Sequence, residues 1–94
     1  MHIAAIVLIK AAPAAVSTLG AEVAGLDGVS EAHSVAASDV DLVAIVKVPD
    51  HEGVARVVTE GIAKLDGVVD TTTMIAFRSY SDADLDAVYE GFGD

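Results

Sequence analysis

The tetrapeptide Leu-Asp-Gly-Val stands at residues 26–29 and again at residues 65–68, 39 positions later. The segments ahead of the two copies also correspond, because each holds an apolar run with a lysine, then a proline, then a stretch rich in alanine and valine. Such an echo is typical of an internal structural repeat. The matching segments are residues 5–10 with Pro13 in the first unit and residues 44–48 with Pro49 in the second.

Each unit of the repeat is interpreted as strand, helix, turn and strand. A proline fits the first turn of a helix because the N–H that it lacks has no intrahelical partner there. Gly28 and Gly67 stand just after a helix end, where the backbone often takes a positive φ. Asp50 is the predicted N-cap of the second helix. The predicted strands are residues 2–10, 29–37, 41–48 and 68–78, and the predicted helices are residues 13–26 and 51–65.

This βαββαβ order predicts an α+β domain of ferredoxin-like topology. Right-handed crossovers place both helices on one face of a four-stranded antiparallel sheet. We expect the domain to occupy residues 1–78. Residues 79–94 are predicted to form a short acidic, amphipathic C-terminal helix, because Ser81 and Asp84 resemble a capping pair and an apolar stripe follows them.

The two central strands are apolar at both alternating sets of positions, in residues 3–9 and 42–48. Alternate residues of a strand face opposite sides of a sheet, so both faces of these strands are apolar. Helices cover only one face, and soluble monomers rarely expose a large apolar patch. A second subunit, or the C-terminal segment, must therefore cover the other face. We expect a homodimer or larger oligomer, which also suits a chain of 94 residues without cysteine.

Composition bears on the partners and the chemistry. Fifteen acidic residues against five basic ones give a net charge of -10, which repels phosphate backbones, so we expect no direct nucleic-acid binding. No apolar run reaches the roughly 18 residues of a membrane span. The N-terminus lacks the basic stretch of a secretory signal, so a cytoplasmic location is expected. His2, His33 and His51 match no metal motif, and we expect no metal, no cofactor and no enzymatic activity.

Taken in order, five segments resemble the ligand-binding (RAM) domain of the Lrp/AsnC family of leucine-responsive, feast/famine regulators, and the resemblance covers residues 2–78. It implies dimers formed by packing sheets face to face, which assemble into rings from tetramers to octamers or decamers. It also implies small effectors, typically amino acids, bound between dimers to regulate transcription of amino-acid metabolism. Full-length members carry an N-terminal helix-turn-helix domain, and this sequence shows no segment that matches it, so the chain resembles a stand-alone effector-binding form. Co-assembly with full-length relatives is one way in which such a form could act. The five segments are residues 6–10, 28–29, 38–41, 65–68 and 70–74.

The resemblance also implies an effector site. The family's Gly-x-x-Asp loop falls on Ser38, Asp39, Val40 and Asp41, with serine in place of glycine. Our hypothesis is that Asp41 and the backbone of residues 38–40 hold the ammonium group of an amino acid. Threonine hydroxyls and the amides at the start of the second helix would meet its carboxylate. The other implied site residues are Thr71, Thr73 and Met74 on the last strand and His51 at the head of that helix.

Other interpretations share the same order of elements. A dimeric α+β barrel enzyme of the monooxygenase type requires a roomy pocket lined by histidine, tryptophan or tyrosine, and this chain has no tryptophan. An ACT-like regulatory domain often has a glycine between its first strand and helix, where this chain has Ala11-Ala12-Pro13. Glu31 and His33 point to one face of a strand and suit either an acid–base pair or an exposed strand pair. An oligomer that binds no ligand also remains open.

Overall fold

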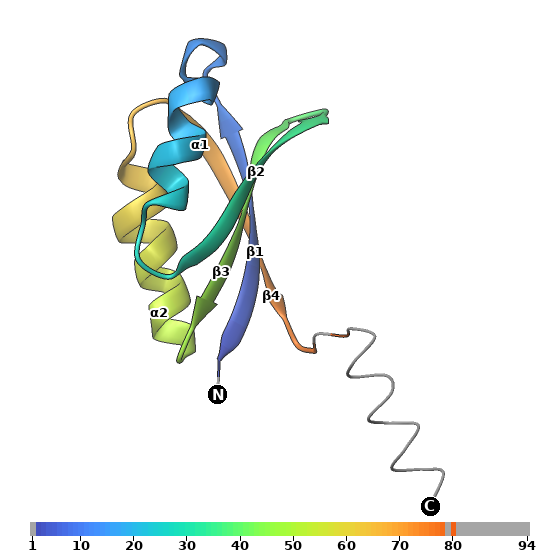
Figure 1. The fold of residues 1–94 in the computed structure, drawn as a ribbon, viewed down its shortest axis with the longest axis vertical. Coiled ribbons are helices and arrows are strands. Elements are labelled where there is room, and N and C mark those ends of the chain that lie inside the picture. The colour runs from blue at the N-terminus through green and yellow to red at the C-terminus, as the bar shows by residue number, and fades with distance from the viewer. Residues whose placement is uncertain (1, 79, 81–94) are drawn as a thin grey trace, which may run out of the picture.

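The computed structural model describes residues 2–78 and residue 80. Its four strands form one antiparallel sheet in the order β2-β3-β1-β4, and the helices lie on one face of that sheet (Figure 1). The ferredoxin-like βαββαβ prediction is therefore confirmed. The predicted C-terminal helix lies outside the described residues. The elements are β1 Ile3–Ala11, α1 Val16–Ala24, β2 Val29–Ala37, β3 Val40–Val48, α2 His51–Arg56 and β4 Val68–Ala76.

The hydrophobic core lies between the sheet and the helices. Alternate residues of the two central strands, β1 and β3, are buried there, and Leu19 and Val23 of α1 pack on them. Burial of these apolar side chains is the main favourable term for folding. The buried strand residues are Ala5, Val7, Ile9, Ala11, Leu42, Ala44, Val46 and Val48.

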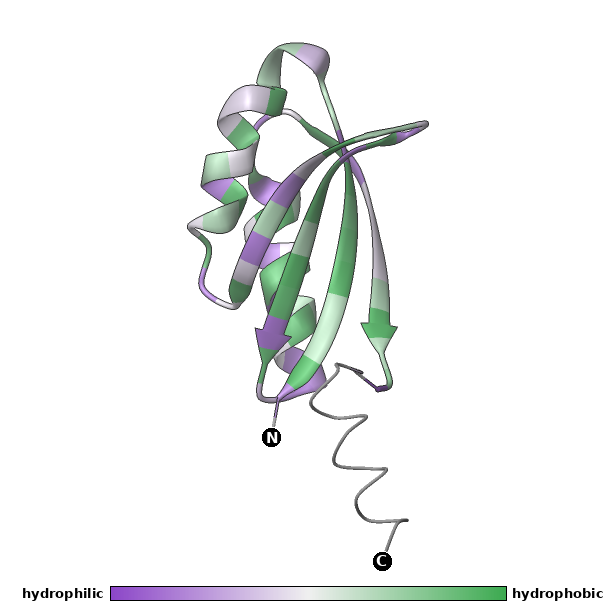
Figure 2. Cartoon of the chain, turned by 45° about the vertical axis from the view of Figure 1, so that its right-hand side comes forward, coloured by the Kyte–Doolittle hydropathy of each residue, from purple (hydrophilic) through white to green (hydrophobic). Residues whose placement is uncertain are grey.

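The other face of the sheet, called here the open face, is also apolar. The apolar alternate residues of β1 and β3 lie on it and are only half-buried, whereas Lys10 and Lys47 on the same face are exposed. Figure 2 shows the apolar colouring continuing along both central strands. None of the elements within residues 2–78 covers this face. Its apolar residues are Ala4, Ile6, Leu8, Val43, Ile45, Met74 and Ala76.

The glycines of the repeated tetrapeptide adopt the backbone conformation that the sequence predicts. Gly28 has φ 93° and Gly67 has φ 95°, a region that side chains other than glycine rarely enter. Each lies in the turn that leads from a helix into the following strand. The repeat therefore corresponds to two equivalent helix-to-strand connections.

The second helix differs from the uninterrupted helix predicted over residues 51–65. It begins as predicted, since the Gly53 amide donates to the Asp50 carboxylate at 2.7 Å. After α2 the chain continues as a π-helix at Val57–Gly61 and a 3-10 turn at Ile62–Lys64. Consecutive β-branched residues and a glycine weaken α-helical geometry there. The Thr59 hydroxyl also donates to the Ala55 carbonyl at 2.6 Å, a bond that tends to bend helices.

The first helix likewise starts later than predicted, because Pro13–Ala15 form a 3-10 turn ahead of α1. Such turns are common at helix ends. In the part of the chain that the structure describes, no helix is both long and apolar enough to cross a membrane.

Candidate functional site

The predicted effector loop is the tight turn between β2 and β3. Ala37 and Val40 pair across it, so Ser38 and Asp39 make the connection. Asp39 has φ 63°, and it is the single residue other than glycine with a positive φ among those described. Aspartate tolerates this conformation better than most residues. Ser38 does not have a positive φ, so the serine that replaces the family's glycine causes no backbone strain.

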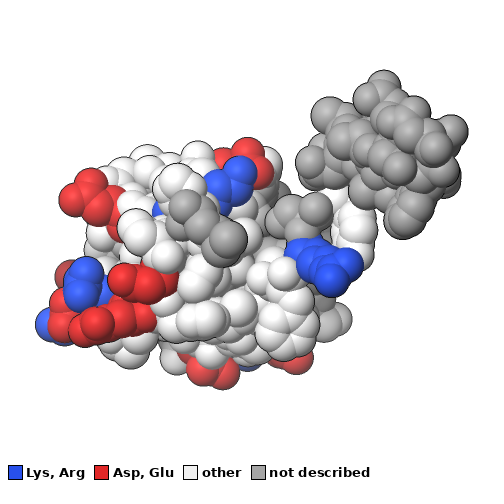
Figure 3. Space-filling view, turned by 90° about the horizontal axis from the view of Figure 1, so that it is seen from below, with Lys and Arg blue, Asp and Glu red and all other residues white. Residues whose placement is uncertain are grey.

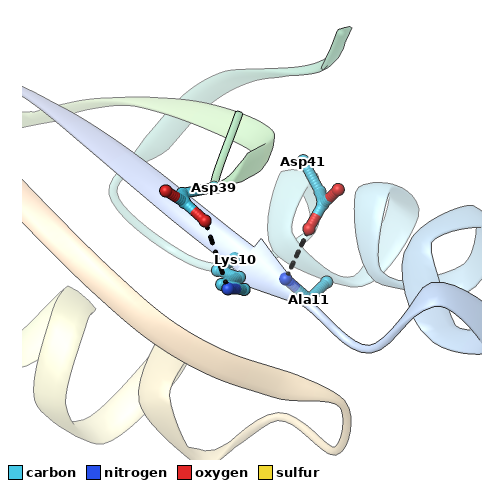
Figure 4. Close-up of polar contacts among 4 residues, drawn as sticks. All are labelled: Lys10, Ala11, Asp39 and Asp41. Carbon is cyan, nitrogen blue, oxygen red and sulfur yellow. Dashed lines mark hydrogen bonds and ion pairs between the residues drawn. The ribbon is translucent and has the colours of Figure 1, made fainter. Parts of the chain in front are cut away.

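Two polar contacts attach this turn to the end of β1 (Figure 4). The Ala11 amide donates to Asp41 Oδ2 at 2.9 Å in a half-buried position. Lys10 Nζ donates to Asp39 Oδ1 at 3.3 Å, where the Asp39 side chain is 85% exposed. Asp41 Oδ1 makes no hydrogen bond to any described residue. Asp41 thus has a structural role through one oxygen, and its other oxygen has no hydrogen-bond partner among the described residues.

The implied site residues on β4 point to opposite faces of the sheet. Thr71 pairs with Ile9 and therefore lies on the helix face, as does Thr73, whereas Met74 pairs with Ile6 on the open face and is 45% exposed. Ile9 also pairs with Leu42 on its other side. Thr71 is therefore level with Leu42 near the start of β3, and the two residues are separated by two strand spacings, or roughly 10 Å. Met74 is three residues further along β4. Along the strands Thr71 is therefore nearer to Asp41 than Met74 is. Asp41, however, alternates with buried Leu42 and so lies on the open face with Met74, not with Thr71.

His51 lies far from Asp41 within one chain. Asp41 is at the start of β3, whereas His51 follows the end of β3 and begins α2. The rise of a strand separates these two ends by more than about 20 Å. Figure 1 shows the β2–β3 turn and the start of α2 at opposite ends of the sheet. A site that uses both residues therefore requires two chains.

Replacing Asp41 with alanine is expected to lower the free energy of unfolding by about 1–2 kcal/mol, because the half-buried Ala11 amide loses its acceptor. Urea denaturation followed by circular dichroism measures this change. Asp39→Asn is the matched control, because its exposed ion pair with Lys10 contributes little and asparagine tolerates a positive φ. Equal stability of Asp41→Ala and the wild type would contradict the structural role of Asp41.

The Glu31 and His33 pair is an exposed strand pair. His33 Nε2 lies 3.7 Å from Glu31 Oε1, and both side chains are more than half exposed on β2. The two residues sit on the open face, opposite Ile45 and Val43 of β3. No group of three or more metal-ligating side chains occurs among the described residues.

A groove that sequence reasoning did not predict lies at the His51 end of the sheet. It is a shallow groove, open to solvent, of about 610 Å³ between the α1–β2 turn, the end of β3 and the second helix. A hollow of this size is within the range of small-molecule sites. The residues come from three separate segments, so no local motif indicated it. They are Leu26, Asp27, Gly28, Lys47, Val48, Pro49, Gly53, Arg56, Val57, Glu60 and Gly61.

Comparisons with known proteins find the same fold in solved structures. A family model described as the Lrp/AsnC ligand binding domain matches residues 4–85. The crystal structure of TTHA0845 from Thermus thermophilus matches with a TM-score of 0.79 and 44% sequence identity. The match covers 84% of this chain and 98% of TTHA0845. The hypothetical protein PHS023 from Pyrococcus horikoshii is 24% identical, covers 83% of this chain and 93% of that chain, and has a TM-score of 0.74.

A longer relative shares the fold. The transcriptional regulator NMB0573 from Neisseria meningitidis, solved as a complex with L-Met, is 15% identical with a TM-score of 0.72. The match covers 84% of this chain and 52% of that chain, so this chain spans about half of the regulator. No curated protein matches the chain.

Proposed function

Because the chain belongs to the Lrp/AsnC ligand-binding domain family, which is regulatory and not enzymatic, we propose that it senses an amino acid through its assembly. Membership of this family decides against the monooxygenase-type enzyme and the ACT-like domain. The observation that carries the proposal is the apolar open face, because a small domain with a second apolar surface requires a partner. In the proposed dimer, the open faces of two chains pack against each other.

We place the effector between chains at the Ser38–Asp41 turn. Asp41 Oδ1, which has no partner among the described residues, is oriented by the Ala11 bond on the other oxygen. A carboxylate held in this way suits an ammonium group. Thr71 lies on the neighbouring part of the sheet, and His51 would come from another chain. A site completed by two chains couples ligand binding to assembly, since the ligand favours the assembled state.

The proposed assembly is a ring of dimers, from a tetramer to an octamer or decamer. In such a ring, binding of an amino acid would shift the balance between oligomers, or between homo-oligomers and co-assemblies with full-length Lrp/AsnC regulators. The acidic charge of this chain disfavours direct contact with DNA. A role in transcription would then act through the DNA-binding relative.

Light scattering coupled to size exclusion, without and with a panel of amino acids beginning with L-methionine, tests this function. L-methionine comes first because NMB0573 of Neisseria meningitidis was solved with L-Met. We expect at least one amino acid to change the mass or to raise the melting temperature of the oligomer. An oligomer that no amino acid affects would contradict the sensing function, and a stable monomer would contradict the proposed assembly.

Asp41→Asn is the variant to compare in the same experiment. Asparagine keeps a carbonyl oxygen for the Ala11 amide, so the fold is preserved, but it removes the charge that would hold an ammonium group. We expect the effector to bind about tenfold more weakly or worse, because charge-assisted hydrogen bonds are the stronger ones. Unchanged affinity in a correctly assembled Asp41→Asn variant would place the effector elsewhere.

A further inference from the structure

The groove at the His51 end of the sheet has one wall built from a single helical stripe. Gly53, Val57, Glu60 and Gly61 are spaced so that they share one side of the helix. The opposite wall is the α1–β2 turn at Leu26–Gly28, and the end of β3 at Val48 closes the floor. The groove lies at the other end of β3 from the Ser38–Asp41 turn.

The rim of this groove carries both signs of charge. Arg56 contributes the positive group, and Asp27 and Glu60 contribute the negative ones. Lys47 also borders the groove, but it alternates with buried Val46 and Val48, so its side chain lies on the open face. Arg56 pairs with Glu52 at 3.7 Å in an exposed contact. Figure 3 shows this end of the molecule, with acidic and basic side chains intermixed on one side of it. Asp27 and Glu60 form no ion pair with any described residue.

The floor of the groove is apolar. Leu26, Val48, Pro49 and Val57 line it between the charged groups. Such a mixture, with an apolar floor and a few convergent polar groups, is typical of sites for small molecules.

The shape of the groove is set by the backbone on both sides. The Lys47 amide donates to the Gly28 carbonyl at 2.9 Å, which holds the α1–β2 turn beside the end of β3. A Cβ atom at Gly28 would approach Val57 Cγ2 to 2.7 Å, so this close approach requires glycine. On the other side, Glu60 and Gly61 belong to the π-helix at Val57–Gly61. Short π-helical segments are frequent at functional sites.

We propose that this groove binds a small zwitterion, namely an α-amino acid with an apolar side chain. Arg56 meets the carboxylate, Asp27 and Glu60 meet the ammonium group, and the side chain lies on Leu26 and Val57. The inference rests on the proposed function for the class of ligand. It places a binding site at the end of the sheet opposite the predicted loop.

Methyl NMR of the whole chain, labelled at leucine and valine methyl groups, tests the site during titration with L-leucine and L-methionine. We expect the methyl signals of Leu26, Val48 and Val57 to shift with saturation. Leucinamide lacks the carboxylate and 4-methylvalerate lacks the ammonium group. Each is expected to bind about tenfold more weakly than L-leucine, because one end of the groove then has no partner.

A pair of double variants provides the control. Arg56→Gln with Glu60→Gln removes one charge of each sign from the groove, and Glu22→Gln with Lys64→Gln does the same at exposed positions outside it. The net charge is therefore the same in both double variants. We expect the groove variant to weaken binding of L-leucine about tenfold or more and the control variant to leave it unchanged. Equal binding by the two would overturn the proposal.

The methyl group of Val40 separates this inference from the proposed function, because Val40 belongs to the predicted effector loop. Shifts at Val40 without shifts at Leu26, Val48 or Val57 would overturn the groove and support the loop. Shifts at the groove without a change at Val40 would support the groove and contradict the loop. Absence of shifts at both places would overturn the groove as a site for apolar amino acids. The light-scattering experiment with the panel of amino acids would then test the loop separately.

Discussion

Ile45→Asp is expected to convert the proposed dimer into monomers and to lower the stability of the protein. Ile45 lies on the open face, where it pairs with Ile6 of β1 on one side and Glu31 of β2 on the other. A carboxylate there would be buried without a partner if two open faces packed together, at a cost of several kcal/mol. A symmetric dimer would include this cost twice, because the same surface is used on both chains.

Light scattering coupled to size exclusion measures the mass of the Ile45→Asp variant directly. Ala21→Asp is the matched control, because it adds the same charge at an exposed position of α1. We expect Ala21→Asp to retain the mass of the wild type. If Ile45→Asp also assembled with the wild-type mass, the open face would not be the interface, and another surface would have to support the oligomer.

Gly67→Ala is expected to lower the free energy of unfolding by about 2–4 kcal/mol. The φ of 95° at Gly67 costs a residue with a side chain about 1–2 kcal/mol. A Cβ atom at this position would also collide with the Cβ of Ala15, so the 3-10 turn ahead of α1 would have to move. The turn is further held by the Ala12 amide, which donates to the Gly67 carbonyl at 2.8 Å. Urea denaturation of the two proteins measures the difference.

Gly20→Ala is the control for Gly67→Ala. Gly20 lies within α1, and a Cβ atom there would be in ordinary contact with Leu42 Cδ2 at 3.8 Å. Alanine favours a helix interior over glycine by about 0.5–1 kcal/mol, so we expect Gly20→Ala to stabilise the protein. A Gly67→Ala variant as stable as the wild type would show that the turn can be rebuilt without a positive φ.

Local patterns in the chain were sufficient to predict the fold. The repeated Leu-Asp-Gly-Val segment indicated two equivalent units, and the glycines at 28 and 67 have the positive φ expected of them. Asp50 caps α2 as expected. The sequence also predicted that β1 and β3 are apolar on both faces of the sheet, because the alternation of side chains along a strand depends on sequence spacing alone. Apart from the comparison of the two repeat copies, each of these features depends on residues within a few positions of one another.

The arrangement of the sites depends instead on which strands are neighbours and in what register. The bond between Asp41 and Ala11 joins residues 30 positions apart, and it exists because β3 and β1 are adjacent in the sheet. The distance of His51 from Asp41 and the opposite faces of Met74 and Thr71, in contrast, follow from sequence spacing along single strands. The groove combines three segments, one of them a π-helix where the sequence predicted a continuous α-helix. Contacts between distant segments form only when the whole core packs, so no local pattern specifies them.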